Sequence, residues 1–196
     1  MARQFAVTWD YRCPFARNAH EALVAGLKEG RDWDVRFWPF SLDQVHVEEG
    51  ETPVWQRGLD EPGVGGVRAL LWGIAVRDAF ADRFLDFHLA AFRARHDEGK
   101  KIAEEAVMRE VAASVGLDPD AVAEEVESGR PLKALEAEHT EAVDGYAVFG
   151  VPTIVEGDEA AFVRLMERGN VDDFAHALDL MASNRLNEFK RTKIPR

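Results

Sequence analysis

Cys13 is the residue of this sequence whose type and position are best suited to chemistry. It follows an apolar segment, residues 5–9, and precedes Pro14, which is favoured at the first position of a helix. A sulfur there faces unpaired backbone N–H groups and the positive end of the helix dipole, which favour the thiolate. Such cysteines titrate at about 3.5–7.5 rather than about 8.5. We therefore expect a nucleophile near neutral pH, helped by Arg12 and Arg17 if they turn toward the sulfur.

A second feature lies far along the chain, in the segment Gly150-Val151-Pro152-Thr153. A proline that opens a strand suits a cis peptide bond, which is uncommon and usually conserved for a purpose. A cis bond would leave the N–H and C=O of Val151 open, and these could hold an extended thiol substrate by strand-like pairing. The alternative is that Cys13 is a small core residue and Pro152 belongs to an ordinary trans turn.

Hydrophobic periodicity predicts the elements that position these two segments. A buried strand over residues 5–9, a helix from residue 14 that ends near Gly30, and a strand over 34–40 form a βαβ unit. A Glu-, Gly- and Pro-rich loop over 47–66 follows. The chain then becomes helical, and the expected helices span 67–77, 79–95, 101–115, a segment from Pro119 capped by Asp118, and 131–143.

Strand signals return after this helical run. Residues 151–155 and 161–165 read as a hairpin with its turn at 156–159, and a last helix over 173–181 is capped by Asn170 or Asp172. The order βαβ, helices, ββα predicts an α/β thioredoxin-like fold with an inserted all-helical domain. We place the thioredoxin-like domain at 1–53 and 145–196, and the helical insertion domain at 54–144.

Composition restricts the partners and the compartment. The formal net charge is −12, so nucleic acid and anionic membranes are disfavoured. One cysteine excludes an intrachain disulfide, and neither a signal peptide nor a transmembrane run is apparent, so a cytoplasmic location is expected. The basic tail after Asn187 reads as a solvated terminus, or as a clamp onto the acidic body or a second subunit, and a homodimer stays open.

Other residues were weighed as sites. The histidines lack the spacing of a metal site, and His20 is expected to pack or to face solvent. The glycines at 63–66 are not followed by the lysine of a P-loop and read as a flexible entry to the insertion. Five aromatic residues could line an apolar groove near the cysteine: Tyr11, Phe15, Trp38, Trp55 and Trp72. Packing in the core is the alternative for each of them, and it is the weakest for Trp55, which lies in a polar loop.

The segment around Asp-Tyr-Arg-Cys-Pro-Phe-Ala resembles the active-site turn of the DsbA family, and residues 150–153 resemble its cis-proline loop. The middle of the chain, from residue 87 to 118, is similar to the helical insertion of DsbA-like and FrnE-like proteins. The resemblance extends more loosely to mycothiol-dependent nitroreductases, 2-hydroxychromene-2-carboxylate isomerases and kappa-class glutathione transferases. It implies an oxidoreductase with Cys13 as nucleophile and a substrate site at Pro14, Phe15, Val151, Pro152 and Thr153.

One departure limits this reading. The family's redox members carry Cys-x-x-Cys, whereas Ala16 stands at the second position here. A dithiol enzyme resolves its mixed disulfide with that second thiol. We therefore expect a monothiol enzyme that uses glutathione or mycothiol as cosubstrate, with no tightly bound cofactor. Two alternatives stay open: a thiol-dependent transferase or isomerase acting on a small molecule, and a noncatalytic binding module.

Overall fold

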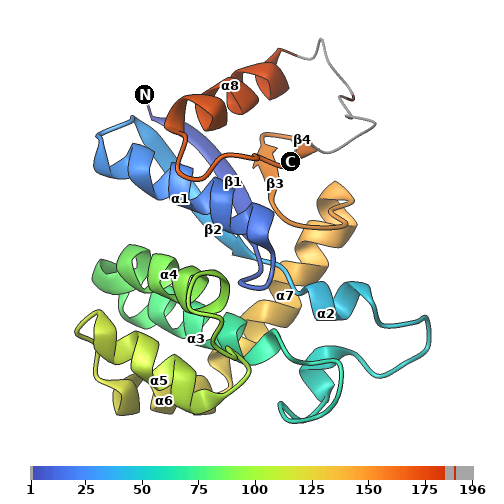
Figure 1. The fold of residues 1–196 in the computed structure, drawn as a ribbon. Coiled ribbons are helices and arrows are strands. Elements are labelled where there is room, and N and C mark those ends of the chain that lie inside the picture. The colour runs from blue at the N-terminus through green and yellow to red at the C-terminus, as the bar shows by residue number, and fades with distance from the viewer. Residues whose placement is uncertain (1, 184–187, 189–196) are drawn as a thin grey trace.

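The computed structural model describes residues 2–183 and 188, and a four-stranded sheet lies at its centre (Figure 1). The strands are β1 Arg3–Trp9, β2 Trp33–Pro39, β3 Thr153–Glu156 and β4 Glu159–Phe162. Their spatial order is β2-β1-β3-β4, with β1 parallel to β2 and the other pairs antiparallel. This is the thioredoxin arrangement that the sequence predicted.

The hairpin has a shorter turn than predicted, because the first strand ends one residue later and the second begins two residues earlier. Residues 157 and 158 make a tight turn, so that pairing resumes at once between Glu156 and Glu159. After Phe162 one more hydrogen bond continues the pairing, from the Val163 amide to the Pro152 carbonyl at 3.1 Å. The carbonyl of Leu165 then accepts from the side-chain amide of Asn18 at 2.9 Å instead of from a neighbouring strand. The second strand, predicted over 161–165, is therefore observed over Glu159–Phe162 and shares only residues 161 and 162 with the prediction.

Two helices flank the parallel half of the sheet. Helix α1 Pro14–Lys28 joins β1 to β2 and packs against both α4 Ala81–His96 and α8 Val171–Ala182. The Asn170 side chain caps α8 by accepting from the Asp173 amide at 2.9 Å, and its other predicted cap, Asp172, lies inside the helix.

The helical run lies between β2 and β3, as predicted (Figure 1). It comprises α3 Val67–Ala79, α4 Ala81–His96, α5 Glu105–Ser114, α6 Pro119–Glu127 and α7 Arg130–Tyr146. Asp118 caps α6, and Pro119 occupies its first turn. Two short helices were not foreseen, α2 Leu42–Val45 and the 3-10 turn η1 Val54–Gln56. Among the described helices, none combines the length and apolar character needed to cross a membrane.

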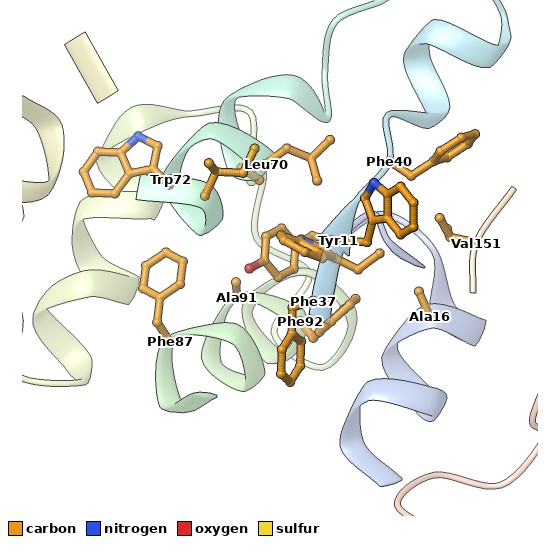
Figure 2. Packing of buried hydrophobic residues seen from close by; sticks show 14 of the residues in the cluster. Tyr11, Ala16, Phe37, Phe40, Leu70, Trp72, Phe87, Ala91, Phe92 and Val151 are labelled. Atoms are coloured by element: carbon orange, nitrogen blue, oxygen red, sulfur yellow. The ribbon is translucent and has the colours of Figure 1, made fainter. Parts of the chain in front are cut away.

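One continuous apolar core runs from the sheet into the inserted helices (Figure 2). Trp72 of α3 and Phe87 of α4 belong to the same buried cluster as Val7 of β1 and Ala16 of α1. The division into two domains stays a prediction, and the two parts share their core. The basic tail, including Lys190, Arg191, Lys193 and Arg196, lies outside the described residues.

Candidate active site

Cys13 caps the first helix and meets the proline loop. Its sulfur accepts a hydrogen bond from the Ala16 amide at 3.4 Å, so it sits at the N-terminus of α1 with Pro14 in the first turn. The thiol also donates to the carbonyl oxygen of Val151, 3.3 Å away, and the Val151–Pro152 peptide bond is cis. Two segments 138 residues apart in sequence thus form one site.

Thr153 holds the proline loop in place through two hydrogen bonds. The Thr153 amide donates to Oγ1 of Thr8 on β1 at 2.8 Å, and the Thr153 hydroxyl donates to the carbonyl of Gly150 at 2.8 Å. The Pro152 carbonyl accepts from the Val163 amide at 3.1 Å, which ties the loop to the chain after β4. Thr153 is buried, so its contacts fix the loop's shape.

The expectation of a lowered thiol pKa is wrong. Burial raises the pKa of Cys13 above its ordinary value. The N–H groups of Ala16 and Phe15 act in the opposite direction but do not reverse the effect, and the Asp10 charge raises the pKa further. A half-buried thiol loses the hydration that its anion needs, and here that loss outweighs the helix N-terminus. Cys13 is therefore a thiol at neutral pH, in keeping with its bond to Val151.

The two arginines that were candidates to assist the thiolate are engaged elsewhere. Arg17 pairs with Asp97 at 2.9 Å. Arg12 pairs with Asp43 at 2.6 Å, and its Nε lies 3.6 Å from buried Asp10. Neither guanidinium is among the groups that shift the Cys13 pKa most.

Arg12 instead anchors the active-site turn to the inserted helices. Asp43, its partner, accepts the amide of Gly66 at 2.8 Å with its other oxygen. Asp10 accepts from the amides of Arg12 and Leu42, each at 2.9 Å. Gly66 was predicted to belong to a flexible segment leading into the insertion, and it is instead held by this hydrogen bond at the start of α3.

A buried chain of hydrogen bonds lies behind the same turn. Burial lowers the pKa of His20 to about 4, and burial together with His20 lowers that of His88, so both rings are neutral. The carbonyl of Thr8 can only accept, so Nε2 of His20 donates to it at 3.1 Å. His88 Nε2 must then donate to His20 Nδ1 at 3.0 Å, and the Tyr11 hydroxyl to His88 Nδ1 at 2.9 Å.

The sequence analysis did not predict this series of hydrogen bonds, because its members come from β1 and the turn after it, from α1 and from α4. His20 was expected to pack or face solvent, and it packs. The signal available was a histidine on the apolar face of each of two helices. The fully satisfied chain fixes the turn residue Tyr11, two positions before the cysteine.

The predicted aromatic lining is largely absent from the site. Tyr11, Trp38 and Trp72 are buried in the core, so they do not line a groove at Cys13. Trp55 is partly buried and packs on His139 with ring centres 5.6 Å apart. Phe15 alone of the five lies partly exposed beside the cysteine. No group of three metal-ligating side chains occurs within the described part of the chain.

A thioredoxin fold with a thiol at the start of its first helix, facing a proline loop, defines the class of this protein. The model of the DsbA-like thioredoxin domain family matches residues 74–179, and the chain belongs to this family.

Solved structures show the same fold. DsbA of Pseudomonas aeruginosa shares 21% identity over 93% of this chain and 83% of its own, with a TM-score of 0.62. The cytosolic disulfide reductase DsbM of the same species, solved with GSH, shares 21% identity over 93% and 100%, also with a TM-score of 0.62. A 2-hydroxychromene-2-carboxylate isomerase shares 16% over 92% and 97%, with a TM-score of 0.65. No protein of curated function matches the sequence.

Proposed function

We propose that this protein is a DsbA-like oxidoreductase that works with one thiol, Cys13, and a low-molecular-weight thiol as its resolving partner. The observation that carries this proposal is the position of the sulfur, which caps α1 and lies 3.3 Å from the carbonyl of the residue before Pro152. A sulfur there can attack a disulfide that lies along the proline loop. Ala16 replaces the second cysteine, so resolution must come from outside.

The reaction balances as two thiol–disulfide exchanges. Cys13 gives up its proton to solvent, and its sulfur attacks a disulfide RS–SR′. The S–S bond breaks, a mixed disulfide Cys13–S–S–R forms, and R′S⁻ leaves and takes up a proton. A deprotonated small thiol, GS⁻, then attacks the sulfur of the R group. The disulfide GS–SR forms, and the Cys13 thiolate is released and takes up a proton from solvent. In sum, the small thiol is oxidised to the disulfide with R, and the R′ half of the substrate disulfide is reduced to a thiol.

The backbone beside Pro152 supports a substrate role for this loop. Among the described residues, none accepts a hydrogen bond from the Val151 amide. The Val151 carbonyl accepts, within the same residues, only from the Cys13 thiol, and that bond is lost when the thiol is deprotonated for reaction. Both groups suit strand-like pairing with a substrate. We assign substrate contact to Pro14, Phe15, Val151 and Pro152, and support of the loop to Thr153.

The resolving thiol is proposed by chemical class, with glutathione and mycothiol as the two candidates and neither as a tightly bound cofactor. DsbM, which has the same fold, was solved with GSH and is described as cytosolic, which favours such a thiol and a cytoplasmic location here. The partner is a small-molecule thiol or disulfide, and neither nucleic acid nor membrane is proposed for this acidic chain.

The test is reduction of a mixed disulfide between glutathione or mycothiol and a peptide, each with the matching thiol in excess. Wild-type protein should turn over, and Cys13→Ser should fall to the uncatalysed rate. Mass spectrometry should show the Cys13 adduct when the free thiol is withheld. Ala16→Cys supplies an internal resolving thiol and should lower the dependence on added thiol. Turnover that persists in Cys13→Ser contradicts the proposal.

One observation favours a second function, a transferase or isomerase that uses a bound small thiol. Burial keeps Cys13 protonated, and a neutral thiol can donate a hydrogen bond to the thiolate of a bound cosubstrate. Serine donates similarly. Binding of glutathione or mycothiol that survives in Cys13→Ser, together with conversion of an aromatic substrate without redox change, would establish this alternative instead.

A further inference from the structure

Arg164 is a cation next to the candidate site, and no carboxylate of residues 2–183 pairs with it. The protein carries 36 acidic residues and its arginines are mostly paired, yet no salt bridge of Arg164 occurs within the described residues. Its guanidinium carbon lies 5.1 Å from the centre of the Phe15 ring and 5.0 Å from that of Phe162. Its charge is felt at the sulfur, where it acts to lower the pKa of Cys13.

The backbone on either side of Arg164 is fixed to the site. Before Arg164, the amide of Val163 donates to the Pro152 carbonyl at 3.1 Å. After it, the carbonyl of Leu165 accepts from the Asn18 side chain of α1 at 2.9 Å. Arg164, the residue between these two anchors, is thus held between the proline loop and α1. The guanidinium is therefore placed by the fold beside the cysteine, although its side chain is exposed.

Aromatic surface surrounds this cation. Phe149 is 66% exposed, and its ring centre lies 5.0 Å from that of Phe162. Phe15 follows Cys13-Pro14, Phe149 precedes the proline loop, and Phe162 ends β4. Three chain segments thus bring apolar rings together around the Arg164 guanidinium, whose charge reaches the sulfur.

We propose that Arg164 binds the carboxylate of a small thiol or disulfide whose apolar or aromatic part rests on Phe15, Phe149 and Phe162. This inference rests on the proposed exchange chemistry at Cys13 and names its substrate class. An anion is the complement of this cation, and a planar guanidinium suits a carboxylate because it can donate two parallel hydrogen bonds. Ring faces below the guanidinium hold its plane while its edge stays free.

The experiment compares two aromatic disulfides of nearly equal size, 4,4′-dithiobis(benzoic acid) and 4,4′-dithiobis(benzamide). Their rates of reaction with Cys13 are measured at 0.15 M salt, where long-range charge effects are screened. The ratio of the two rates is the readout. A change in the thiolate fraction alters both rates equally, so the ratio isolates recognition of the carboxylate from the effect of Arg164 on the thiol.

Arg164→Gln should lower the acid-to-amide ratio by roughly three- to tenfold, the range for a charge-assisted contact at the surface. Arg164→Lys should keep part of the preference. The matched control is Arg83→Gln, which makes the same change of net charge far from Cys13. Arg83 lies near the N-terminus of α4, whereas the active-site turn contacts the other end of that helix, through His96 and Tyr11. Its ratio should equal that of the wild type. Phe149→Ala should slow both probes with little change in ratio.

The outcomes separate the two proposals. If both probes react and the ratio is the same in Arg164→Gln, the arginine acts only on the thiolate or not at all, and this inference is overturned while exchange at Cys13 stands. If neither probe reacts with folded wild-type protein, the proposed function fails and the inference fails with it.

Discussion

Arg12 lies so close to Gly66 that a Cβ added to the glycine would meet the arginine Nε at 2.5 Å. The arginine end is held by Asp43, so it has little freedom to withdraw. We expect Gly66→Ala to lower the free energy of unfolding by about 1–3 kcal/mol, as other overpacked sites do, and to slow disulfide exchange at Cys13.

The neighbouring glycine provides the control. A Cβ on Gly65 would meet nothing within 4 Å, so Gly65→Ala should change stability by less than about 0.5 kcal/mol. Urea unfolding of both variants measures the difference. Equal stabilities would mean that the turn before Cys13 is not anchored through Arg12 and Gly66.

The hydroxyl of Tyr11 ends the buried chain that includes His88 and His20. Tyr11→Phe leaves the Nδ1 acceptor of His88 without its donor in the core, which should cost about 1–3 kcal/mol of unfolding free energy. Tyr146, the other tyrosine, makes no hydroxyl hydrogen bond within the described residues, so Tyr146→Phe is the matched control and should be nearly neutral. Chemical denaturation of the pair would detect the difference.

Acid should destabilise the fold through His20 and His88. Their pKa values are lowered in the folded state, His20 to about 4, so their contribution is complete above the unfolded pKa of about 6.5 and is lost as pH falls below it. Between pH 7 and 5.5 the two together should remove roughly 2.5 kcal/mol of unfolding free energy. Denaturation series at both pH values measure this loss.

A substitution separates these histidines from other groups that titrate, such as buried Asp10. His88→Gln can still donate to His20 and accept from Tyr11, but it does not titrate. It should reduce the fall between pH 7 and 5.5 by roughly 1.2 kcal/mol. His176→Gln, at an exposed position, should leave the fall unchanged. The same fall in all three proteins would show that the buried pair does not govern acid sensitivity.

The pKa of Cys13 should lie above that of a free thiol, because burial opposes the thiolate. Iodoacetamide alkylation of the folded protein should reach half its maximal rate at a higher pH than alkylation of the same chain in urea. Arg164→Gln should move the folded profile further toward high pH, since the arginine charge favours the thiolate. A folded midpoint below about 8.5 would restore the behaviour first expected from the helix N-terminus.

The sequence by itself determined the order of the elements and the two ends of the site. Local patterns are sufficient for this: alternating and helical spacing of apolar residues, Pro14 at the start of a helix, Asp118 as a cap, and Pro152 before a short strand. The βαβ and ββα halves then leave few topologies, and the predicted one brings Cys13 to Val151.

Only the tertiary structure decided the chemistry around that meeting point. The pKa of Cys13 depends on how much water the proline loop excludes, and the helix N-terminus alone gave the wrong direction. The partners of Arg12, and the absence of an acidic partner for Arg164 in the described part of the chain, are set by segments distant in sequence. Desolvation and charge pairing are sums over neighbours in space, and a linear pattern reports only neighbours along the chain.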